Sequence, residues 1–287
     1  MNDKKIIGVD FGATSIKAGV VHGDQLSATK SKHINNAGTE DDVLQDLFFV
    51  IDQLIDKEVV SIGVGVPSVV DTEEGIVYDV INIPSWKKVP LKKILEERYH
   101  IPAFINNDAN CFALGEHYFG KGIGKKDMIG LTIGTGLGAG IIINNHLFAG
   151  ANCGAGEFGM VAYLDHVYEY YACGQFFNNV YHTDGPLVFE KAKAGDRQTQ
   201  QWYAEMGTHL GNAIKTMMYT YDISLIIFGG SVRLAYPYFQ ENMWKQIKSF
   251  AFTKSAERLR IEISNMENPA IFGAAGLYYD NVQVLLR

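Results

Sequence analysis

Two glycine-rich turns in this sequence have the residue types that bind phosphate groups. The first follows Asp10 in VDFGATS, and the second lies within LTIGTGLG. Glycine lets the main chain approach a ligand closely, and the backbone N–H groups of such turns bind anions. The carboxylate of Asp10 is an oxygen ligand of the kind that Mg²⁺ prefers, here through water. The residues expected to bind the phosphates are Gly12, Thr14, Lys17, Thr132, Gly134, Thr135 and Gly136.

A glycine pair, Gly229–Gly230, follows the apolar run LIIF. Such a pair offers a flat backbone surface to a nucleoside. A tight turn in an ordinary α/β core would explain any one of these three features. Their presence together, each after a strand-like run, favours a site for a nucleoside phosphate.

Two other phosphate motifs fail on context. Gly115 to Lys121 matches the first seven positions of GxxxxGK[ST], but Gly122 replaces the hydroxyl and the segment ends a helical pattern. Gly134 to Ala139 matches GxGxxA, but this run leads into the strand-like IIINN. The dinucleotide cradle needs a helix N-terminus there.

Asp108 is the candidate general base. It follows the strand-like run AFINN and begins a helical pattern, so its carboxylate could accept a hydroxyl proton from a substrate. The alternative is that it only caps the helix. Asn107 beside it could bind substrate hydroxyls. Glu157, in a glycine-rich run, is either an ion-pair partner or a substrate ligand.

These residues depend on alternating strands and helices to position them. Apolar, β-branched runs predict strands, and apolar residues three and four apart predict helices. We expect strands near 4–12, 15–26 (with a turn at 22–24), 59–67, 103–107, 128–134, 139–143 and 224–230, and helices near 41–57, 90–99, 108–119, 199–221 and 269–280. The region 150–184 lacks a regular pattern. The alternation predicts an α/β fold.

Composition indicates a globular protein of two lobes. The chain has 287 residues, 47% of them hydrophobic, and a formal charge of −7, so no basic excess points to nucleic acid as a partner. Residues 128–156 carry no Asp, Glu, Lys or Arg, but their glycines and asparagines argue for buried strands and against a membrane span. The three cysteines form no CxxC motif, and the N-terminus shows no signal segment, so we expect a cytoplasmic protein.

A faint internal repeat supports two related lobes. Residues 9–21 (VDFGATSIKAGVV) and 131–143 (LTIGTGLGAGIII) both read as strand, small-residue turn and strand. Gly12 and Gly134 occupy the same place in each run. The repeat predicts two similar hairpins, one in each lobe.

Together these motifs resemble the ROK family (repressor, open reading frame, kinase) of the actin-like ATPase superfamily, over nearly the whole chain. The segments that carry the resemblance are VDFGATSIKAGVV, GVGVPSVVD, NIPSW, NNDANCFALGE, LTIGTGLGAGIIINNHLFAGANCGAGEFG and IIFGGSV. It implies two actin-like (ribonuclease H-like) lobes with a central cleft, assembled as a homodimer. The N-terminal lobe would span 1–110, with a C-terminal helix at about 270–287 packed back on it, and the C-terminal lobe 111–269.

The resemblance implies an ATP-dependent sugar kinase that phosphorylates the 6-hydroxyl of a hexose or N-acetylhexosamine. Asp108 would be the base and Asp10 would organise Mg²⁺, through water. The residues expected at the sugar are Asn107, Glu157, Asn82 and Ser68, and those at the nucleoside are Gly229 and Gly230.

The sequence departs from the family at its zinc motif. Met160 stands where the family has a histidine, and only Cys173 remains of the cysteines. Zinc needs about four ligands, so we predict no zinc site. The family's last sugar-binding glutamate falls near Asn178 or Asn179. Aromatic packing is expected to brace this loop in place of the metal, by Tyr163, Tyr168, Tyr170, Tyr171, Phe176 and Phe177.

Two alternatives to a kinase remain open. One is a sugar-sensing regulator, which in this family carries a helix-turn-helix ahead of the first phosphate strand. That strand starts by about Lys5 here, which leaves no room for the module within this sequence. The other is a sugar-binding protein that has lost catalysis, for which Met160 is the motivation.

Overall fold

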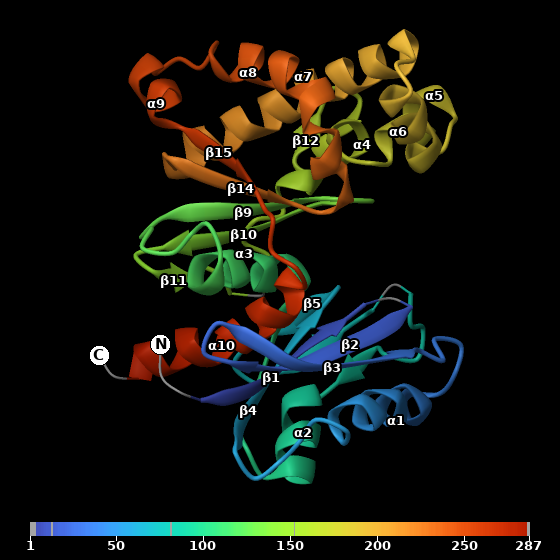
Figure 1. The fold of residues 1–287 in the computed structure, drawn as a ribbon, viewed down its shortest axis with the longest axis vertical. Helices are drawn as coiled ribbons and strands as arrows, with labels where there is room; N and C mark the ends of the chain where they lie inside the picture. Colours follow the sequence, from blue (N-terminus) through green and yellow to red (C-terminus); the bar gives the residue numbers. More distant parts are fainter. Residues whose placement is uncertain (1–3, 13, 81, 152, 286–287) are drawn as a thin grey trace. The chain divides into compact units, whose positions relative to one another are not determined.

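The computed structural model describes residues 4–12, 14–80, 82–151 and 153–285. The chain divides into two compact units (Figure 1). The first contains the chain up to Lys126, residues 140–155 and the chain from Asn265 onward, and the second contains residues 127–139 and 156–264. The lobe boundary near 110 stays a prediction. By its contacts, 111–126 groups with the first unit, because the helix that begins at Asp108 packs along the C-terminal helix, and 140–155 groups there as well.

The first unit is built on a five-stranded sheet of order β3-β2-β1-β4-β8. Strands β1, β4 and β8 are parallel, and the β1–β2 and β2–β3 pairs are antiparallel. A three-stranded sheet of order β5-β6-β7 accompanies it. The elements are β1 Lys5–Phe11, β2 Ser15–His22, β3 Gln25–His33, α1 Glu40–Ile51, β4 Val59–Val66, β5 Val69–Asp71, β6 Ile76–Tyr78, β7 Lys88–Val89, α2 Leu91–Tyr99, β8 Ala103–Asn107, α3 Asp108–Phe119, β11 His146–Leu147 and α10 Pro269–Leu285.

The C-terminal helix α10 packs directly on the first sheet, and Figure 1 shows this red helix along the blue strands. Gly8 of β1 and Gly63 of β4 make the close approach possible. A Cβ at Gly8 would lie 2.0 Å from the Ile271 carbonyl oxygen, and one at Gly63 would lie 1.8 Å from that of Ala274. Glycine at these positions therefore brings the helix against the strands that carry Asp10 and lead to Ser68.

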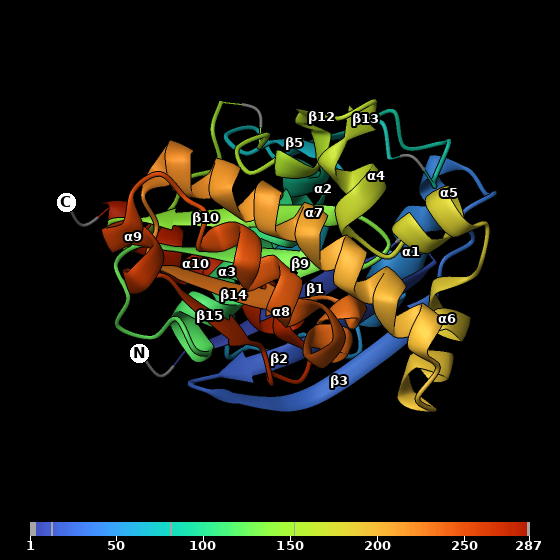
Figure 2. The ribbon, with the colours of Figure 1, turned by 90° about the horizontal axis from the view of Figure 1, so that it is seen from above.

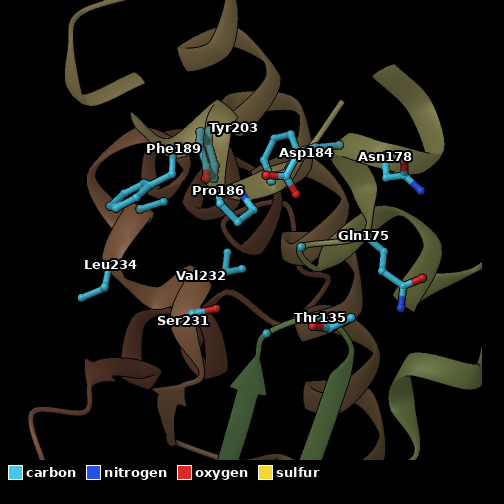
Figure 3. A pocket seen from close by; sticks show the side chains of 15 residues that line it. Thr135, Gln175, Asn178, Asp184, Pro186, Phe189, Tyr203, Ser231, Val232 and Leu234 are labelled. Atoms are coloured by element: carbon cyan, nitrogen blue, oxygen red, sulfur yellow. The ribbon is translucent and has the colours of Figure 1, made fainter. Parts of the chain in front are cut away.

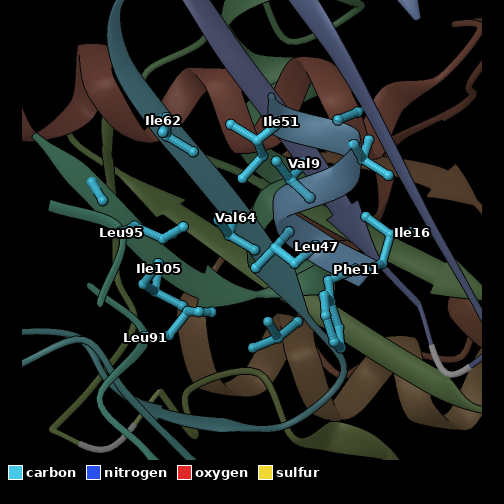
Figure 4. Close-up of a cluster of buried hydrophobic side chains, with 14 of the residues drawn as sticks. Val9, Phe11, Ile16, Leu47, Ile51, Ile62, Val64, Leu91, Leu95 and Ile105 are labelled. Carbon is cyan, nitrogen blue, oxygen red and sulfur yellow. The ribbon is translucent and has the colours of Figure 1, made fainter. Parts of the chain in front are cut away.

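An apolar cluster forms the core of the first unit, drawn in Figure 4. Its members come from strands β1, β2, β4 and β8 and from helices α1 and α2. Each such aliphatic side chain contributes about 1.5–3 kcal/mol on full burial. Helix α1 begins with a capping box, in which Thr39 and Asp42 bond each other's backbone N–H groups. The helix ends at Ile51, earlier than the expected 57.

The second sheet has the order β11-β10-β9-β14-β15, which repeats the strand order of the first. The predicted internal repeat is thus present as architecture, with the β1–β2 and β9–β10 hairpins in equivalent places. The boundary between the two units falls within β10. The elements are β9 Met128–Ile133, β10 Leu137–Ile143, η1 Phe158–Met160, β12 Ala162–Tyr163, β13 His166–Val167, α4 Tyr168–Ala172, α5 Phe176–Tyr181, α6 Gly185–Lys193, α7 Arg197–Tyr221, β14 Leu225–Gly229, η2 Ser231–Ala235, α8 Tyr236–Ile247, α9 Thr253–Arg258 and β15 Arg260–Ile263.

Helices α7 and α8 lie side by side in the second unit (Figure 2). Gly207 and Gly211 of α7 face α8, where added Cβ atoms would lie 2.3 Å from the Phe239 oxygen and 2.6 Å from the Met243 oxygen. The predicted helix 199–221 is confirmed, whereas α8 and α9 were not predicted. The stretch 150–184, expected to be irregular, contains short helices α4 and α5. Within the described ranges, no helix has the length and apolar character that a membrane span requires.

Candidate functional site

A row of predicted site residues crosses the first sheet where its parallel strands end. Asp10 lies opposite Lys17 on one side and opposite Gly65 on the other, and Gly65 lies opposite Asn106. The carboxyl ends of β1, β4 and β8 therefore share one edge. Ligands of α/β folds bind at such edges.

Asp108 stands one step beyond this row, as the first residue of α3. Its side chain is exposed. The helix cap is Asn107, whose side-chain oxygen accepts from the Ala109 N–H at 2.8 Å, and the Asp108 carboxylate also accepts from this N–H at 2.8 Å. Asn107 thus occupies the cap position, and the exposed Asp108 follows it as the first residue of the helix; its role as the base stays a prediction. A Cβ at Gly65 would lie 3.7 Å from the Asp108 Cα, which places the backbone of Asp108 beside β4.

Asp10 is a half-buried carboxylate with no hydrogen-bond partner among the described residues. Burial raises its pKa, and the positive charge of Lys17 partly opposes this shift. The buried Cys111 thiol lies beside Gly65, which pairs with Asp10, since a Cβ at Gly65 would lie 3.0 Å from its sulfur. Its pKa is raised by burial and further by the charges of Asp108, Cys153 and Asp10. Asp10 and Asp108 thus lie near the same thiol.

Asn107, Ser68 and Asn82, also predicted at the sugar, differ in their contacts with this edge of the sheet. The Asn107 amide donates to the Ser68 carbonyl at 3.4 Å, while the Ser68 hydroxyl donates to the Tyr78 carbonyl. Asn82 is exposed in the loop between β6 and β7 and makes no side-chain hydrogen bond within the described part of the chain. In that loop, Trp86 stacks on Phe11 with ring centroids 4.7 Å apart, which anchors the loop to the end of β1.

The first glycine turn joins β1 to β2. The Gly12 N–H donates to the Ser15 carbonyl at 3.0 Å, and the Thr14 carbonyl accepts from the Ile34 N–H at 3.0 Å. The Thr14 and Lys17 side chains are exposed. Their polar groups are therefore accessible to an anion.

The second glycine turn has two N–H groups available to a ligand. The Gly134 N–H donates to the Gly136 carbonyl at 3.0 Å, and the Gly134 carbonyl accepts from the Gly174 N–H at 2.8 Å. The N–H groups of Thr135 and Gly136 donate to no group in the described ranges. Adjacent free N–H groups of this kind form an anion site.

Thr132 differs from its expected role. It lies on β9, before the turn, and its hydroxyl donates to the Gly138 carbonyl at 3.1 Å. The single proton of the Thr132 hydroxyl is already donated to Gly138. The threonine of this turn whose hydroxyl can donate to a phosphate is therefore the exposed Thr135.

The Gly229–Gly230 pair lies next to this turn, because Gly229 pairs with Thr132 in the sheet. Gly230 has φ of 74°, and a Cβ there would lie 2.3 Å from the Ile133 oxygen. No side chain fits at that position, so the backbone is bare there, and its contact with a nucleoside stays a prediction.

A cavity of about 420 Å³ opens beside these glycines (Figure 3). This volume lies in the range of small-molecule sites. Phe189, Leu234 and Val232 contribute apolar walls, and the hydroxyl of the almost fully buried Tyr203 has no hydrogen-bond partner in the described chain. The lining residues are Gly134, Thr135, Gly174, Gln175, Phe177, Asn178, Asp184, Gly185, Pro186, Phe189, Tyr203, Ser231, Val232, Leu234 and Ala235.

Most of these lining residues were missed by the sequence analysis. They come from α5, α6, α7 and η2, segments far apart along the chain with no shared spacing. Asn178, one of two positions considered for a sugar contact, lines this cavity. The other, Asn179, donates its amide N–H to the Tyr170 carbonyl at 3.2 Å.

Glu157 is an exposed residue just before η1. Although the residue as a whole is exposed, its carboxyl group is partly shielded from water. This desolvation raises the pKa of Glu157, and the negative charge of Glu169 raises that pKa further. Glu169 was not predicted as a site residue. Its carboxylate accepts from the Leu137 N–H at 2.8 Å and so holds the end of the second glycine turn.

Aromatic rings pack through the loop where the family motif would bind zinc. Tyr163 stacks on Tyr168 at 4.4 Å and His166 on Tyr170 at 3.9 Å, between ring centroids. The Cys173 thiol donates to the Thr135 carbonyl at 2.8 Å. Within the described residues, no group of three or more His, Cys, Asp or Glu side chains could hold a metal ion.

Comparison with known proteins gives a family match. The profile of the ROK family matches residues 6–281. A glucokinase from Thermotoga maritima is 26% identical over 97% of this chain and 98% of its own length. A xylose repressor from Caldicellulosiruptor bescii is 26% identical over 93% of this chain and 75% of its own. The crystal structure of a ROK family glucokinase from Streptomyces griseus, in complex with glucose and AMPPNP, is 26% identical, with a TM-score of 0.79 over 95% of this chain and 98% of that one.

Proposed function

Because the chain belongs to the ROK family and has its actin-like α/β fold, we propose that it is an ATP-dependent sugar kinase. The reaction is transfer of the γ-phosphate to the 6-hydroxyl of a hexose or N-acetylhexosamine. The observation that carries this proposal is the row at the edge of the first sheet, where Asp10, Asn106 and the exposed Asp108 follow one another.

In the proposed mechanism, Asp108 accepts the proton of the sugar hydroxyl as its oxygen attacks the γ-phosphorus. Asn107, Ser68, Asn82 and Glu157 orient the sugar. Phosphoryl transfer depends mostly on such positioning and on charge neutralisation. A positioned base contributes about 10²- to 10⁴-fold to the rate.

The nucleoside and part of its phosphate chain are assigned to the second unit. The N–H groups of Thr135 and Gly136 donate to phosphate oxygens, together with the first turn (Gly12, Thr14, Lys17), and the 420 Å³ cavity next to Gly229–Gly230 takes the nucleoside. Asp10 fits a hydrated Mg²⁺, since its half-buried carboxylate has no other hydrogen-bond partner in the described chain. When bound, Mg²⁺ would neutralise the phosphate charge.

The proposal includes a homodimer and a cytoplasmic location, where ATP is supplied. The acceptor is a hexose or an N-acetylhexosamine. Specificity between them depends on single hydroxyl contacts, because a site built to bond a hydroxyl strongly rejects its absence. An assay across a sugar panel identifies the acceptor.

The test is a coupled ADP-release assay with glucose, mannose, fructose and N-acetylhexosamines. We expect turnover with at least one sugar. In Asp108→Asn, kcat should fall about 10²- to 10⁴-fold while calorimetry shows sugar binding close to wild type, because only proton acceptance is lost. Asp24→Asn, an exposed turn aspartate of the same unit, is the control and should keep full kcat.

Sugar binding without turnover by the wild type would instead identify a catalytically silent sugar-binding or sugar-sensing protein. The exposed Met160, at the family's histidine position, is the observation that favours this second candidate. Turnover unchanged in Asp108→Asn would show that another group is the base.

A further inference from the structure

Cys153 is a buried residue whose side chain reaches the strand that leads to Asp108. It is only 5% exposed. Its thiol donates to the Asn106 side-chain oxygen at 2.8 Å and accepts from the Asn110 amide at 3.2 Å. Asn106 and Asn110 lie on either side of Asp108 in the sequence. The thiol therefore contacts both ends of the segment that contains the proposed base.

Asn106 is the centre of a small buried network. Its side-chain oxygen accepts from the Asn107 N–H at 2.8 Å, from the Asn110 amide at 2.9 Å and from the Cys153 thiol. The first of these bonds fixes the backbone of Asn107, whose own side chain caps α3. A buried network of this kind is rigid when all its donors are in place. The network thus sets the direction in which α3 starts, and with it the position of Asp108.

The backbone at Cys153 indicates that the thiol itself is required there. Its φ is 59°, in the left-handed region that favours glycine. Glycine would adopt this conformation without strain, and the neighbouring Gly154 shows that the segment accommodates small residues. A cysteine that is held in a glycine conformation and forms two side-chain hydrogen bonds is best explained by those bonds.

We propose that Cys153 is a positioning residue for the phosphoryl-transfer reaction. Its thiol holds Asn106, and through Asn106 the start of α3, so that Asp108 and Asn107 meet the sugar in one fixed orientation. This inference rests on the proposed kinase function. It adds Cys153 to the residues that order the sugar-binding part of the site. It assigns Cys153 no role in nucleotide binding.

Three substitutions separate positioning from folding. Cys153→Ser retains a donor, Cys153→Ala removes it, and Cys153→Gly removes it while relieving the backbone strain. We expect Cys153→Ala and Cys153→Gly each to lose about tenfold in kcat/KM for the sugar, the worth of one buried hydrogen bond, while KM for ATP is unchanged. The kcat/KM of Cys153→Ser for the sugar should stay within about threefold of the wild-type value.

The decisive comparison is between activity and stability. Cys153→Gly should melt at or above the temperature of Cys153→Ala and still lose the same activity. The control is Ser61→Ala, which removes another buried donor of this unit, from the Ser61 hydroxyl to the Pro102 carbonyl at 3.0 Å. It should lower the melting temperature and leave both KM values and kcat unchanged. Faster amide exchange at Asn107 in the Ala and Gly variants would report the loosened network without reference to turnover.

The inference is overturned if Cys153→Gly retains wild-type kinetics, if its losses appear equally in KM for ATP, or if amide exchange at Asn107 does not change. Failure of the proposed function looks different. In that case wild-type protein shows no turnover with any sugar, whereas amide exchange still measures the network.

Discussion

Asp10 lies in an environment that disfavours its charged form. Its carboxylate is half-buried at the end of β1 and has no hydrogen-bond partner in the described residues, and burial raises its pKa. A carboxylate in such a place weakens the fold at neutral pH. Shifts of this kind gather at functional sites, and a hydrated cation would compensate the charge. Asp10 thus has a chemical reason to be present that the fold alone does not supply.

The stability of Asp10→Asn tests this reading. A raised folded-state pKa means that the stability contribution is fully present below the ordinary pKa of about 4 and is lost as pH rises through the folded-state pKa. The asparagine variant avoids that loss. We expect it to melt at a higher temperature than wild type at pH 7, with the difference closing below about pH 4. Thermal melts from pH 3.5 to 8 measure this.

The same variant should lose about 10²-fold in turnover, because charge neutralisation at the phosphates is impaired. If Asp10→Asn loses stability relative to wild type as the pH rises from 4 to 7, the environment assigned to Asp10 is contradicted.

At the level of elements, glycines decide how closely α10 can approach the first sheet. Gly8 and Gly63 lie under the helix, and Gly273 of the helix faces α3, where a Cβ would lie 1.6 Å from the Cys111 carbonyl oxygen. All three contacts are with backbone, which cannot rotate away. Helix α10 therefore fixes β1, β4 and α3 together; β1 carries Asp10, α3 carries Asp108, and β4 leads to Ser68.

Gly63→Ala should disrupt this packing. Its Cβ would lie 1.8 Å from the Ala274 oxygen, so the helix must move. Overpacking of this kind costs about 1–3 kcal/mol or more, and we expect the free energy of unfolding in urea to fall by at least that amount. The control is Gly154→Ala, where an added Cβ meets nothing within 4 Å and the free energy should change by less than about 0.5 kcal/mol. Equal effects of the two changes would contradict the packing argument.

In the molecule as a whole, each unit carries its own set of proposed ligand-binding residues. The first unit carries Asp10, Asn107 and Asp108, and the second carries the glycine turn at Thr135 and the cavity lined by Val232. The nucleoside and the sugar should therefore be bound by separate sets of residues. Ligands stabilise the folded state by mass action, by about 2.7 kcal/mol at a hundred times Kd, so melting temperature reports each ligand by itself.

Val232→Phe should separate the two ligands. Val232 projects into the cavity in Figure 3, and a larger ring would fill space assigned to the nucleoside. We expect AMPPNP to raise the melting temperature of this variant much less than that of wild type, while the shift with sugar is unchanged. Leu187→Phe, at an exposed position of α6 outside the cavity lining, is the control and should respond normally to both ligands. Loss of the sugar response together with the nucleotide response would contradict this division.

The sequence by itself determined the strands and helices on which Asp10, Asp108 and the second glycine turn lie. Local patterns fixed the strand before Asp10, the strand before Asp108 and the glycine turn at Gly134, because hydrophobic periodicity and glycine conformation act over a few residues. The repeat of residues 9–21 in 131–143 predicted two similar hairpins, and these lie in two sheets of the same strand order.

Only the tertiary structure decided which residues share an environment. The register that sets Asp10 opposite Gly65, and Gly65 opposite Asn106, depends on pairing between strands about fifty residues apart. The cavity lining, the contact of Glu169 with the second turn and the bond from Cys153 to Asn106 depend likewise on distant segments. Such contacts follow from the packing of whole helices and strands, which no local spacing encodes. For the same reason the sequence placed Thr132 in the turn, whereas the structure uses its hydroxyl proton inside the hairpin.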